Sequence, residues 1–280
     1  MAKAIMIQGT ASGVGKTILT LALCRIFKQD GHSVSPFKAQ NMTTNTCVTK
    51  PGHEIAVSQW LQALAADAEQ CADINPVILK PFEGQTQVVL GGKALGTIDA
   101  HNFKEVKDKI VPEIMKAYNR LCDKYDIIVI EGAGSPAELN LNKDDVVNMG
   151  MAKRAKSPVI LVSDIDRGGV FASLYGTVAL LGDEERAYVK ATVINRFRGD
   201  IAHFDGGIKI IEDITKLPAA GVIPYIKINL PEEDDLFRSD KTFGTASDFE
   251  SQFNNIAETV RNALDMKLIY RILDEGVQSQ

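Results

Sequence analysis

The residues best suited to chemistry stand near the start of the chain, in the stretch IQGTASGVGKT of residues 7–17. Glycines let successive backbone N–H groups turn inward around phosphate oxygens, and a lysine and a hydroxyl residue complete such a loop. Lys16 would reach the β- and γ-phosphates of a nucleotide, and Thr17 would offer its hydroxyl to Mg²⁺. The common spacing is G-x4-G-K-[ST], whereas Gly9 lies six residues before Gly15 and Thr10 takes the usual glycine position. We predict a phosphate-binding loop (P-loop) whose leading glycine stands one residue earlier than usual, rather than a purely structural turn.

Two further groups would complete a site for a magnesium nucleotide. Glu131 ends the apolar run of YDIIVIEGAGS (125–135), and a carboxylate there can hold Mg²⁺ directly or through water. Its alternative role is to cap the following turn. Lys38, in PFKAQNM (36–42), would neutralise charge on a transferring phosphoryl group, unless it is a solvated surface lysine. A P-loop in the same sheet favours the metal and phosphate roles.

The ends of two later apolar runs are also polar. The stretch SDIDRGGVF (163–171) contains aspartates that could be ligand contacts or only helix N-caps. The stretch NRFRGD (195–200) offers Asn195, which could read a base edge, and arginines that are either anion contacts or surface charges. The four histidines are isolated, and we assign them no chemistry. The charged residues at these two ends are Asp164, Asp166, Arg167, Arg196 and Arg198.

Short apolar runs alternate with helical patterns along most of the chain. Strands that are almost wholly apolar, separated by helices, imply a parallel sheet covered on both faces. The sequence thus predicts a doubly wound α/β fold, whose ligand site lies at the carboxyl ends of the strands. The predicted strands are 4–9, 33–39, 76–82, 86–92, 125–132, 157–166, 188–197 and 219–226. The predicted helices are 15–30, 54–70, 103–124, 144–156, 169–181 and 207–216.

The alternation stops after the charged stretch LPEEDDLFRSDKTFGTAS (230–247). One amphipathic helix is expected in FESQFNNIAETVRNALDMKLIYRIL (249–273), because apolar residues recur there at helical spacing. It either packs on the domain as a tail helix or docks a partner, and packing is favoured. We therefore place one main domain at 1–235 and a linker with the C-terminal tail helix at 236–280.

Composition and charge exclude several other classes of protein. The formal net charge of −5 argues against a nucleic-acid partner, because a protein that binds the phosphate backbone needs a net basic face. No stretch approaches the roughly 18 apolar residues of a membrane span, and no signal peptide is recognised. We expect a cytoplasmic protein without a membrane partner. The cysteines have no CxxC pair and indicate neither a disulfide framework nor a zinc site; they are Cys24, Cys47, Cys71 and Cys122.

Several long strings together resemble one enzyme family. From about residue 4 to Asp235 the chain closely resembles the synthetase domain of glutamine-hydrolysing cobyric acid synthase. The strings that carry the resemblance include IQGTASGVGKT, PFKAQNM, IIVIEGAGSPAELNL, DVVNMGMA, SDIDRGGVFASLYGT and VINRFRGD. The loop also resembles that of dethiobiotin synthetase, G-T-x-[ST]-x-V-G-K-T. This resemblance accounts for the extra residue between Gly9 and Gly15. The resemblance implies a P-loop NTPase fold of the dethiobiotin-synthetase type.

The resemblance also implies a reaction. In that family ATP phosphorylates a carboxylate, and ammonia then displaces phosphate to leave an amide. ATP and Mg²⁺ would be the cofactors. The substrate would be a corrinoid, adenosylcobyrinic acid a,c-diamide, whose peripheral carboxylates are amidated to adenosylcobyric acid on the route to cobalamin. Such chemistry needs no protein nucleophile, because positioning and charge neutralisation are the main tasks.

Individual residues take roles from the same resemblance. Lys16, Lys38 and Asp145 would be catalytic, and Asn195 would contact adenine. Nucleotide binding would otherwise fall to Thr10, Ser12, Gly13, Val14, Gly15, Lys16 and Thr17. Mg²⁺ would be held by Thr17 and Glu131, with Glu54 as a further metal ligand. The substrate-side residues would be Gln40, Asn41 and Asn148.

One departure from the family concerns ammonia. Full-length members carry a glutamine amidotransferase domain with a catalytic cysteine on a tight elbow, whereas all four cysteines here precede Asp235 and none is flanked by glycine. The tail helix resembles the extreme C-terminal helix of the family. We therefore expect ammonia from a separate glutaminase subunit or from solution, with an engineered or decayed chain as the remaining alternative. A homodimer is a further partner to test.

Three other functions remain open. A dethiobiotin-synthetase-like ligase shares the loop and Lys38, but leaves EGAGSPAE and DVVNMGMA without an explanation. A partition-type ATPase switch usually has K-G-G-x-G-K-[ST], and Ala11 stands where its lysine would be. A non-catalytic scaffold for a glutaminase is not distinguished from an enzyme by residues alone. Because the synthetase strings are intact, the amide synthetase is favoured.

Overall fold

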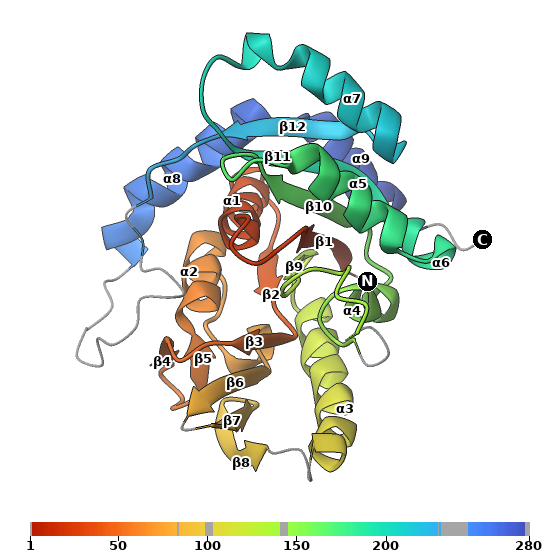
Figure 1. Cartoon of the computed structure of the whole chain (residues 1–280). Coiled ribbons are helices and arrows are strands. Elements are labelled where there is room, and N and C mark those ends of the chain that lie inside the picture. The colour runs from red at the N-terminus through yellow and green to blue at the C-terminus, as the bar shows by residue number, and fades with distance from the viewer. Residues whose placement is uncertain are drawn as a thin grey trace.

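The centre of the molecule is a six-stranded parallel sheet with strand order β12-β11-β10-β1-β9-β2 (Figure 1). The structure is a computed structural model that describes residues 2–82, 84–98, 103–140, 145–228, 230 and 246–277. The strands are β1 (Lys3–Gly9), β2 (Val34–Phe37), β9 (Ile127–Glu131), β10 (Val159–Asp164), β11 (Val189–Phe197) and β12 (Ala219–Pro224). Helices cover both faces of this sheet, so the predicted doubly wound α/β fold is confirmed.

The helices divide between the two faces. On one face α1 (Lys16–Gln29) packs against β1, β2 and β9, with α2 (Val57–Ala66) beside it. On the other face α3 (Phe103–Cys122) packs against β9 and α5 (Val170–Leu180) against β10, with α4 (Met149–Ala155) between them in Figure 1. The remaining helices on this side are α6 (Asp183–Arg186) and α7 (Asp205–Thr215). Strands β9 and β10 are therefore buried along their whole length, as their apolar sequences require.

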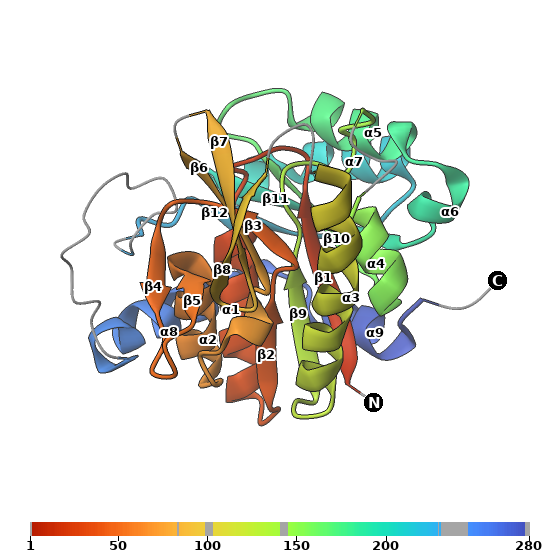
Figure 2. The same cartoon turned by 90° about the horizontal axis from the view of Figure 1, so that it is seen from below.

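A second, mixed sheet corrects the prediction of one parallel sheet. Its order is β3-β6-β7-β8, and it lies beyond the β2 edge of the main sheet (Figure 1 and Figure 2). The strands are β3 (Gln40–Met42), β6 (Val77–Phe82), β7 (Gln85–Leu90) and β8 (Lys93–Ile98). The runs 76–82 and 86–92 were expected in the parallel sheet, but the short links between β6, β7 and β8 leave no room for the crossover that parallel neighbours need. Gly91 and Gly92 make the second link with φ angles of +57° and +78°, as a tight hairpin requires.

Two predicted helices begin later than the sequence indicated. The helix expected at 54–70 is preceded by a small antiparallel hairpin of β4 (Thr46–Val48) and β5 (Glu54–Ala56), and α2 starts only at Val57. The helix expected at 144–156 starts at Met149, while residue 144 lies outside the described residues. Short 3-10 turns also form at Ala72–Ile74 and Ile201–His203.

The tail contains two helices, not the single one expected. They are α8 (Ala246–Ala263) and α9 (Met266–Glu275), and the chain turns between them. The turn pairs with the main sheet: Leu264 forms a bridge with Gly221, and the Asp265 backbone N–H donates to the Ala220 carbonyl at 2.7 Å. The Asp265 side chain then caps α9 by accepting from the Leu268 N–H.

Both tail helices pack onto the domain, as favoured from the sequence. Helix α8 lies against α1 and β12, and α9 lies against β1 and β12. The boundary after Asp235 and the first part of the region expected to hold the linker, residues 236–245, lie outside the described residues. Within the described part of the chain, no helix combines the length and apolarity that crossing a membrane would need.

Candidate active site

The P-loop joins the end of β1 to the start of α1. Gly13 and Gly15 have φ angles of +72° and +100°, a left-handed conformation that glycine adopts readily. A Cβ atom at Gly15 would lie 2.0 Å from Nδ2 of Asn195, so no side chain fits there. The loop ends at the N-terminus of α1, where free N–H groups and the helix dipole favour a phosphate. The predicted strand, loop and helix are all present in the predicted order.

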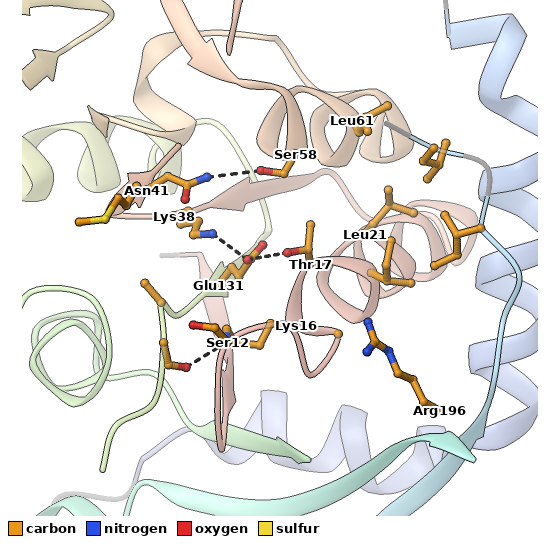
Figure 3. Close-up of a pocket in the computed structure, with 18 residues that line it drawn as sticks. Ser12, Lys16, Thr17, Leu21, Lys38, Asn41, Ser58, Leu61, Glu131 and Arg196 are labelled. Atoms are coloured by element: carbon orange, nitrogen blue, oxygen red, sulfur yellow. Dashed lines mark hydrogen bonds and ion pairs between the residues drawn. The ribbon is translucent and has the colours of Figure 1, made fainter. Parts of the chain in front are cut away.

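A cavity of ≈ 370 Å³ opens at the P-loop (Figure 3). Its volume is within the range of small-molecule sites. The sequence-predicted residues that line it are Ser12, Gly13, Gly15, Lys16, Thr17, Lys38, Asn41 and Glu131. Its apolar lining comes from α1, α2, β3, the loop after β9 and the segment after β12, and consists of Ile18, Leu21, Met42, Leu61, Ala133, Ile228 and Leu230. The cavity therefore combines charged groups with an apolar surface.

Lys16 reaches from the P-loop to the loop after β9. Its ammonium donates to the carbonyl oxygens of Ala11 at 2.9 Å and Gly134 at 3.0 Å. The residue is buried, but it still lines the cavity. An ammonium binds phosphate oxygens more strongly than neutral carbonyls, so Lys16 is placed to exchange these contacts for a nucleotide.

Glu131 is the centre of the polar cluster. The Thr17 hydroxyl and the Lys38 ammonium both donate to its Oε1, each at 2.9 Å (Figure 3). Thr17 comes from α1, Lys38 directly follows β2, and Glu131 ends β9. Lys38 and Glu131 are neighbours because β2 pairs with β9. The structure thus brings together the hydroxyl, the acid and the second lysine that the sequence predicted. Lys38 is buried, so it is not the surface lysine that was the alternative.

Two glutamines that the sequence did not single out hold the other oxygen of Glu131. The side-chain amides of Gln62 and Gln59 donate to Oε2 at 2.6 Å and 3.4 Å. Both residues are fully buried in α2, three positions apart in the run VSQWLQALAA. Residues three apart share a helix face. Two amides on the buried face of a largely apolar helix were the signal that could have revealed them, because buried amides need partners.

The donor set fits Mg²⁺ better than a metal held by protein alone. In the described part of the chain, no group of three or more His, Cys, Asp or Glu residues could hold a metal ion. Mg²⁺ is usually held by one or two carboxylates together with substrate phosphates and water. Thr17 and Glu131 meet that requirement, since their oxygens lie 2.9 Å apart beside the P-loop.

Glu54, the third predicted metal ligand, contacts residues outside the Thr17–Lys38–Glu131 cluster. Its carboxylate pairs with Lys80 and accepts from the Thr46 hydroxyl within the β4–β6 region. It is not among the described residues that line the cavity. The structure thus places Glu54 against Lys80 and Thr46, and its metal role stays a prediction.

The predicted substrate-side residues separate into two groups. Asn41 lines the cavity and donates to Gln59 Oε1 at 2.9 Å, whereas its neighbour Gln40 is not among the described lining residues. Asp145 and Asn148 stand before α4. The Asp145 carboxylate accepts from three backbone N–H groups, those of Val147, Asn148 and Gly150, and the Asn148 amide donates to a carbonyl in the loop after β9. These two residues hold loop structure, and their catalytic and substrate roles stay predictions.

Asn195 links the P-loop to the end of β11. Its Nδ2 donates to the Val14 carbonyl at 2.9 Å, and its Oδ1 accepts from the Arg196 backbone N–H at 2.9 Å. Both ends of the amide are thus engaged, while the adenine contact stays a prediction. Arg196 has a φ of +60° and lines the cavity, and its guanidinium pairs with Asp164 at 3.1 Å.

The aspartates after β10 do not cap the helix that follows. Helix α5 begins after Gly169, which gives no side-chain cap. Asp164 instead pairs with Arg196, and Asp166 pairs with Arg198 at 2.7 Å. The alternative of helix N-caps is therefore wrong for both aspartates. Thr10, predicted in the nucleotide set, shares a hydroxyl contact of 2.9 Å with Ser163 at the end of β10.

The four cysteines are free thiols, as expected. Burial and the nearby Glu131 charge raise the pKa of the Cys24 thiol. Burial, followed by the charge of Glu54, raises the pKa of Cys47 to about 12. Both thiols therefore stay protonated near neutral pH and are poor nucleophiles.

Comparison with known proteins extends these observations. Residues 5–237 match the family model described as the CobQ/CobB/MinD/ParA nucleotide binding domain. A cobyric acid synthase from Clostridium novyi is 52% identical over 233 residues, which are 83% of this chain and 46% of that protein. One from Streptococcus sanguinis is 52% identical over 235 residues, 84% of this chain and 47% of that protein. The chain thus spans about half the length of the curated relatives it matches.

Among solved structures, the MinC:MinD cell division complex of Aquifex aeolicus is 16% identical with a TM-score of 0.47, covering 100% of this chain and 99% of that chain. The resemblance to cobyric acid synthase that the sequence strings carry is confirmed by the two bacterial relatives. The match of the family model covers most of the chain and includes the P-loop, Lys38, Glu131 and Asn195. The chain therefore belongs to the CobQ/CobB/MinD/ParA family of nucleotide-binding domains.

Proposed function

We propose that this domain is the ATP-dependent amide synthetase of a cobyric acid synthase. The observation that carries the proposal is the cluster of Thr17, Lys38 and Glu131, in which one carboxylate oxygen accepts from both a P-loop hydroxyl and a buried lysine. A P-loop alone would serve any nucleotide-binding protein. Lys38 adds a second cation near Lys16, where a transferring phosphoryl group would carry its charge. The 52% identity to cobyric acid synthases supports a corrinoid acceptor.

The proposed reaction has two steps. A carboxylate oxygen of the acceptor attacks the γ-phosphorus of ATP, the bond from that phosphorus to the ADP oxygen breaks, and an acyl phosphate forms. Ammonia then attacks the acyl carbon, the bond from that carbon to the phosphate oxygen breaks, and the proton that ammonia loses leaves with the phosphate as the amide forms. The protein forms no bond with the substrate, so its tasks are positioning and charge neutralisation.

Each part of the cluster takes one of these tasks. The P-loop N–H groups and Lys16 would bind the β- and γ-phosphates. Thr17 and Glu131 would hold Mg²⁺, which supplies positive charge at the phosphate oxygens when it is bound. Lys38 would leave Glu131 to contact the γ-phosphoryl oxygens, and so would neutralise charge as that group moves to the acceptor.

The acceptor would be adenosylcobyrinic acid a,c-diamide, and the product adenosylcobyric acid. Asn41 and Ser58 line the cavity together with Lys38, which supports an acceptor carboxylate at that end. Gln40, Asp145 and Asn148 stay predictions for substrate contact or catalysis. Ammonia would come from a separate glutaminase subunit or from solution, and a homodimer is the other assembly to test.

The test is direct amidation of the corrinoid. The purified chain is incubated with ATP, Mg²⁺ and adenosylcobyrinic acid a,c-diamide, with ammonium in one reaction and glutamine in another, and the corrinoid is followed by mass spectrometry. We expect stepwise amidation with ammonium and none with glutamine, and we expect Lys16→Ala to lose the ammonium-dependent amidation. A parallel reaction with diaminopelargonic acid and CO₂ tests a dethiobiotin-type ligase. No amidation in any reaction that contains the corrinoid, despite nucleotide binding, would reject the proposal for the isolated chain.

A further inference from the structure

Gln62 connects the two residues that are proposed to hold Mg²⁺. Its Nε2 donates to the Thr17 backbone carbonyl at 3.2 Å and to Glu131 Oε2 at 2.6 Å. A side-chain amide nitrogen carries two hydrogens, so one hydrogen serves each acceptor. The residue is fully buried and comes from α2, which is a different element from those that carry Thr17 and Glu131. One amide therefore ties the start of α1 to the end of β9.

This contact controls the orientation of the Glu131 carboxylate. The terminal torsion of a glutamate is broad and imposes little preference of its own. Here the Thr17 hydroxyl and the Lys38 ammonium both donate to Oε1, and Gln62 donates to Oε2. With both oxygens held, Oε1 stays directed at the P-loop, and its spacing from the Thr17 hydroxyl is fixed.

We propose that Gln62 is a positioning residue that sets the affinity of this site for Mg²⁺ without touching the metal or the substrate. The inference rests on the proposed function, because that proposal assigns Mg²⁺ to Thr17 and Glu131. Hydrogen-bond partners of metal ligands typically contribute about 10- to 100-fold to metal affinity. Because Gln62 contacts both ligand residues, its removal loosens the two sides of the site together.

Gln59 provides a matched comparison on the same helix. It is also a fully buried amide, but its contact with Glu131 Oε2 is long, at 3.4 Å. Its own oxygen accepts from Asn41 at 2.9 Å and from the Ser58 hydroxyl at 3.0 Å, and both of these residues line the cavity. Gln59 therefore supports the end of the cavity assigned to the acceptor, whereas Gln62 supports the end assigned to the metal.

The test separates metal-dependent from metal-independent nucleotide binding. Binding of N-methylanthraniloyl-ATP is followed by fluorescence in EDTA and during titration with MgCl₂, with no acceptor present. For Gln62→Met, which keeps the volume of the side chain but has no donor, we expect the half-saturating Mg²⁺ concentration to rise about 10-fold or more. The affinity in EDTA should stay within about twofold of the wild-type value, because the P-loop and Lys16 are unchanged.

Three further variants make the result specific. Gln59→Met should shift the half-saturating Mg²⁺ concentration by less than about threefold, consistent with its longer contact. Gln70→Met should behave like wild type, since in the described part of the chain Gln70 donates to the Ala68 carbonyl in its own loop and to no residue of the cavity. Gln62→Asn keeps an amide that is too short to span both acceptors, so it replaces Gln62→Met if thermal unfolding shows that the methionine variant does not fold.

The outcomes distinguish this inference from the proposed function. An unchanged Mg²⁺ requirement in the Gln62 variants would overturn it, as would an equal loss of affinity with and without Mg²⁺, which would indicate a structural role. A shift in Gln59→Met as large as that in Gln62→Met would also overturn it. If the Mg²⁺ split is observed but wild type amidates no corrinoid, the positioning role stands and the proposed function fails.

Discussion

The Lys38 ammonium lies 2.9 Å from Oε1 of Glu131, and only 5% and 1% of the two side chains are exposed. Taking two charges out of water costs several kcal/mol for each ion, so such a pair persists only where further donors satisfy it. The Thr17 hydroxyl and the Gln62 amide supply those donors. Removal of the Lys38 ammonium would leave the Glu131 carboxylate buried without the cation at its Oε1.

The first prediction concerns the stability that this pair controls. Lys38→Met should lower the free energy of unfolding by about 3–5 kcal/mol, because Glu131 would keep a buried charge without its cation. The double variant Lys38→Met with Glu131→Gln should regain much of that loss, since neither charge then remains. Urea unfolding of wild type, both single variants and the double variant measures the coupling. Strict additivity of the two single losses would show that the pair is not coupled.

The second prediction concerns nucleotide affinity. Lys16→Ala removes an ammonium that would bind phosphate oxygens, and hydrogen bonds to charged groups contribute about 1.5–3 kcal/mol each. We therefore expect nucleotide affinity to fall by about 10- to 100-fold, measured by isothermal titration calorimetry with ATP and Mg²⁺. Lys116→Ala is the control, because Lys116 is an exposed lysine whose partner among the described residues is Glu113 on the same helix. Equal affinity in the Lys16 and Lys116 variants would contradict a phosphate role for Lys16.

The third prediction uses two glycines with opposite surroundings. Gly15→Ala should abolish nucleotide binding and destabilise the fold, because its Cβ would lie 2.0 Å from Asn195 Nδ2 at a φ of +100°. Gly176→Ala, in α5, meets no atom within 4 Å and should stabilise the fold by about 0.5–1 kcal/mol through helix propensity. Thermal unfolding tests both signs. Combining Gly15→Ala with Asn195→Ala relieves the clash but not the backbone strain, so recovery should be partial.

The sequence could predict the parts of the site that are local in the chain. The P-loop, the strand before it and the helix after it follow from one short stretch, and Glu131 follows from its place at the end of an apolar run. Parallel pairing of β1 with β9 then brings Glu131 to the P-loop. This step needs only the rule that strand ends meet at one edge of the sheet.

The remainder depended on contacts between distant elements, which the sequence pattern does not specify. Gln59 and Gln62 lie inside an apolar helical run, and their partner Glu131 is about 70 positions later in the chain. Glu54 lies in the β4–β5 hairpin and pairs with Lys80, a contact that the sequence pattern does not specify, and its metal role stays a prediction. The runs that form β6 and β7 contain short apolar stretches like those of a parallel strand, and their short connections show that they pair antiparallel.

The fourth prediction concerns the attachment of the tail and its pH dependence. Asp30, at the end of α1, accepts two hydrogen bonds from the Arg261 guanidinium of α8, at 2.8 Å and 3.0 Å, and one from the Tyr270 hydroxyl of α9. Burial alone would raise the pKa of Asp30, but the hydrogen bonds from Arg261 and Tyr270 outweigh it and lower the pKa. A carboxyl whose pKa is lowered on folding contributes stability above its unfolded value of about 3.9, and this stability is lost as the pH falls through the lower folded value.

Asp30→Asn should therefore destabilise the protein near neutral pH by about 1 kcal/mol, the upper end for a surface ion pair, and the difference from wild type should shrink as the pH falls below about 4. Urea unfolding at pH 7 and at the lowest pH where both proteins fold provides the comparison. Asp274→Asn is the matched control, because among the described residues Asp274 pairs with the exposed Lys3 alone, and its loss should change stability by less than about 0.5 kcal/mol. If Asp30→Asn loses the same amount of stability at both pH values, the charge of the Asp30 carboxylate does not stabilise the packing of α8 and α9 on α1.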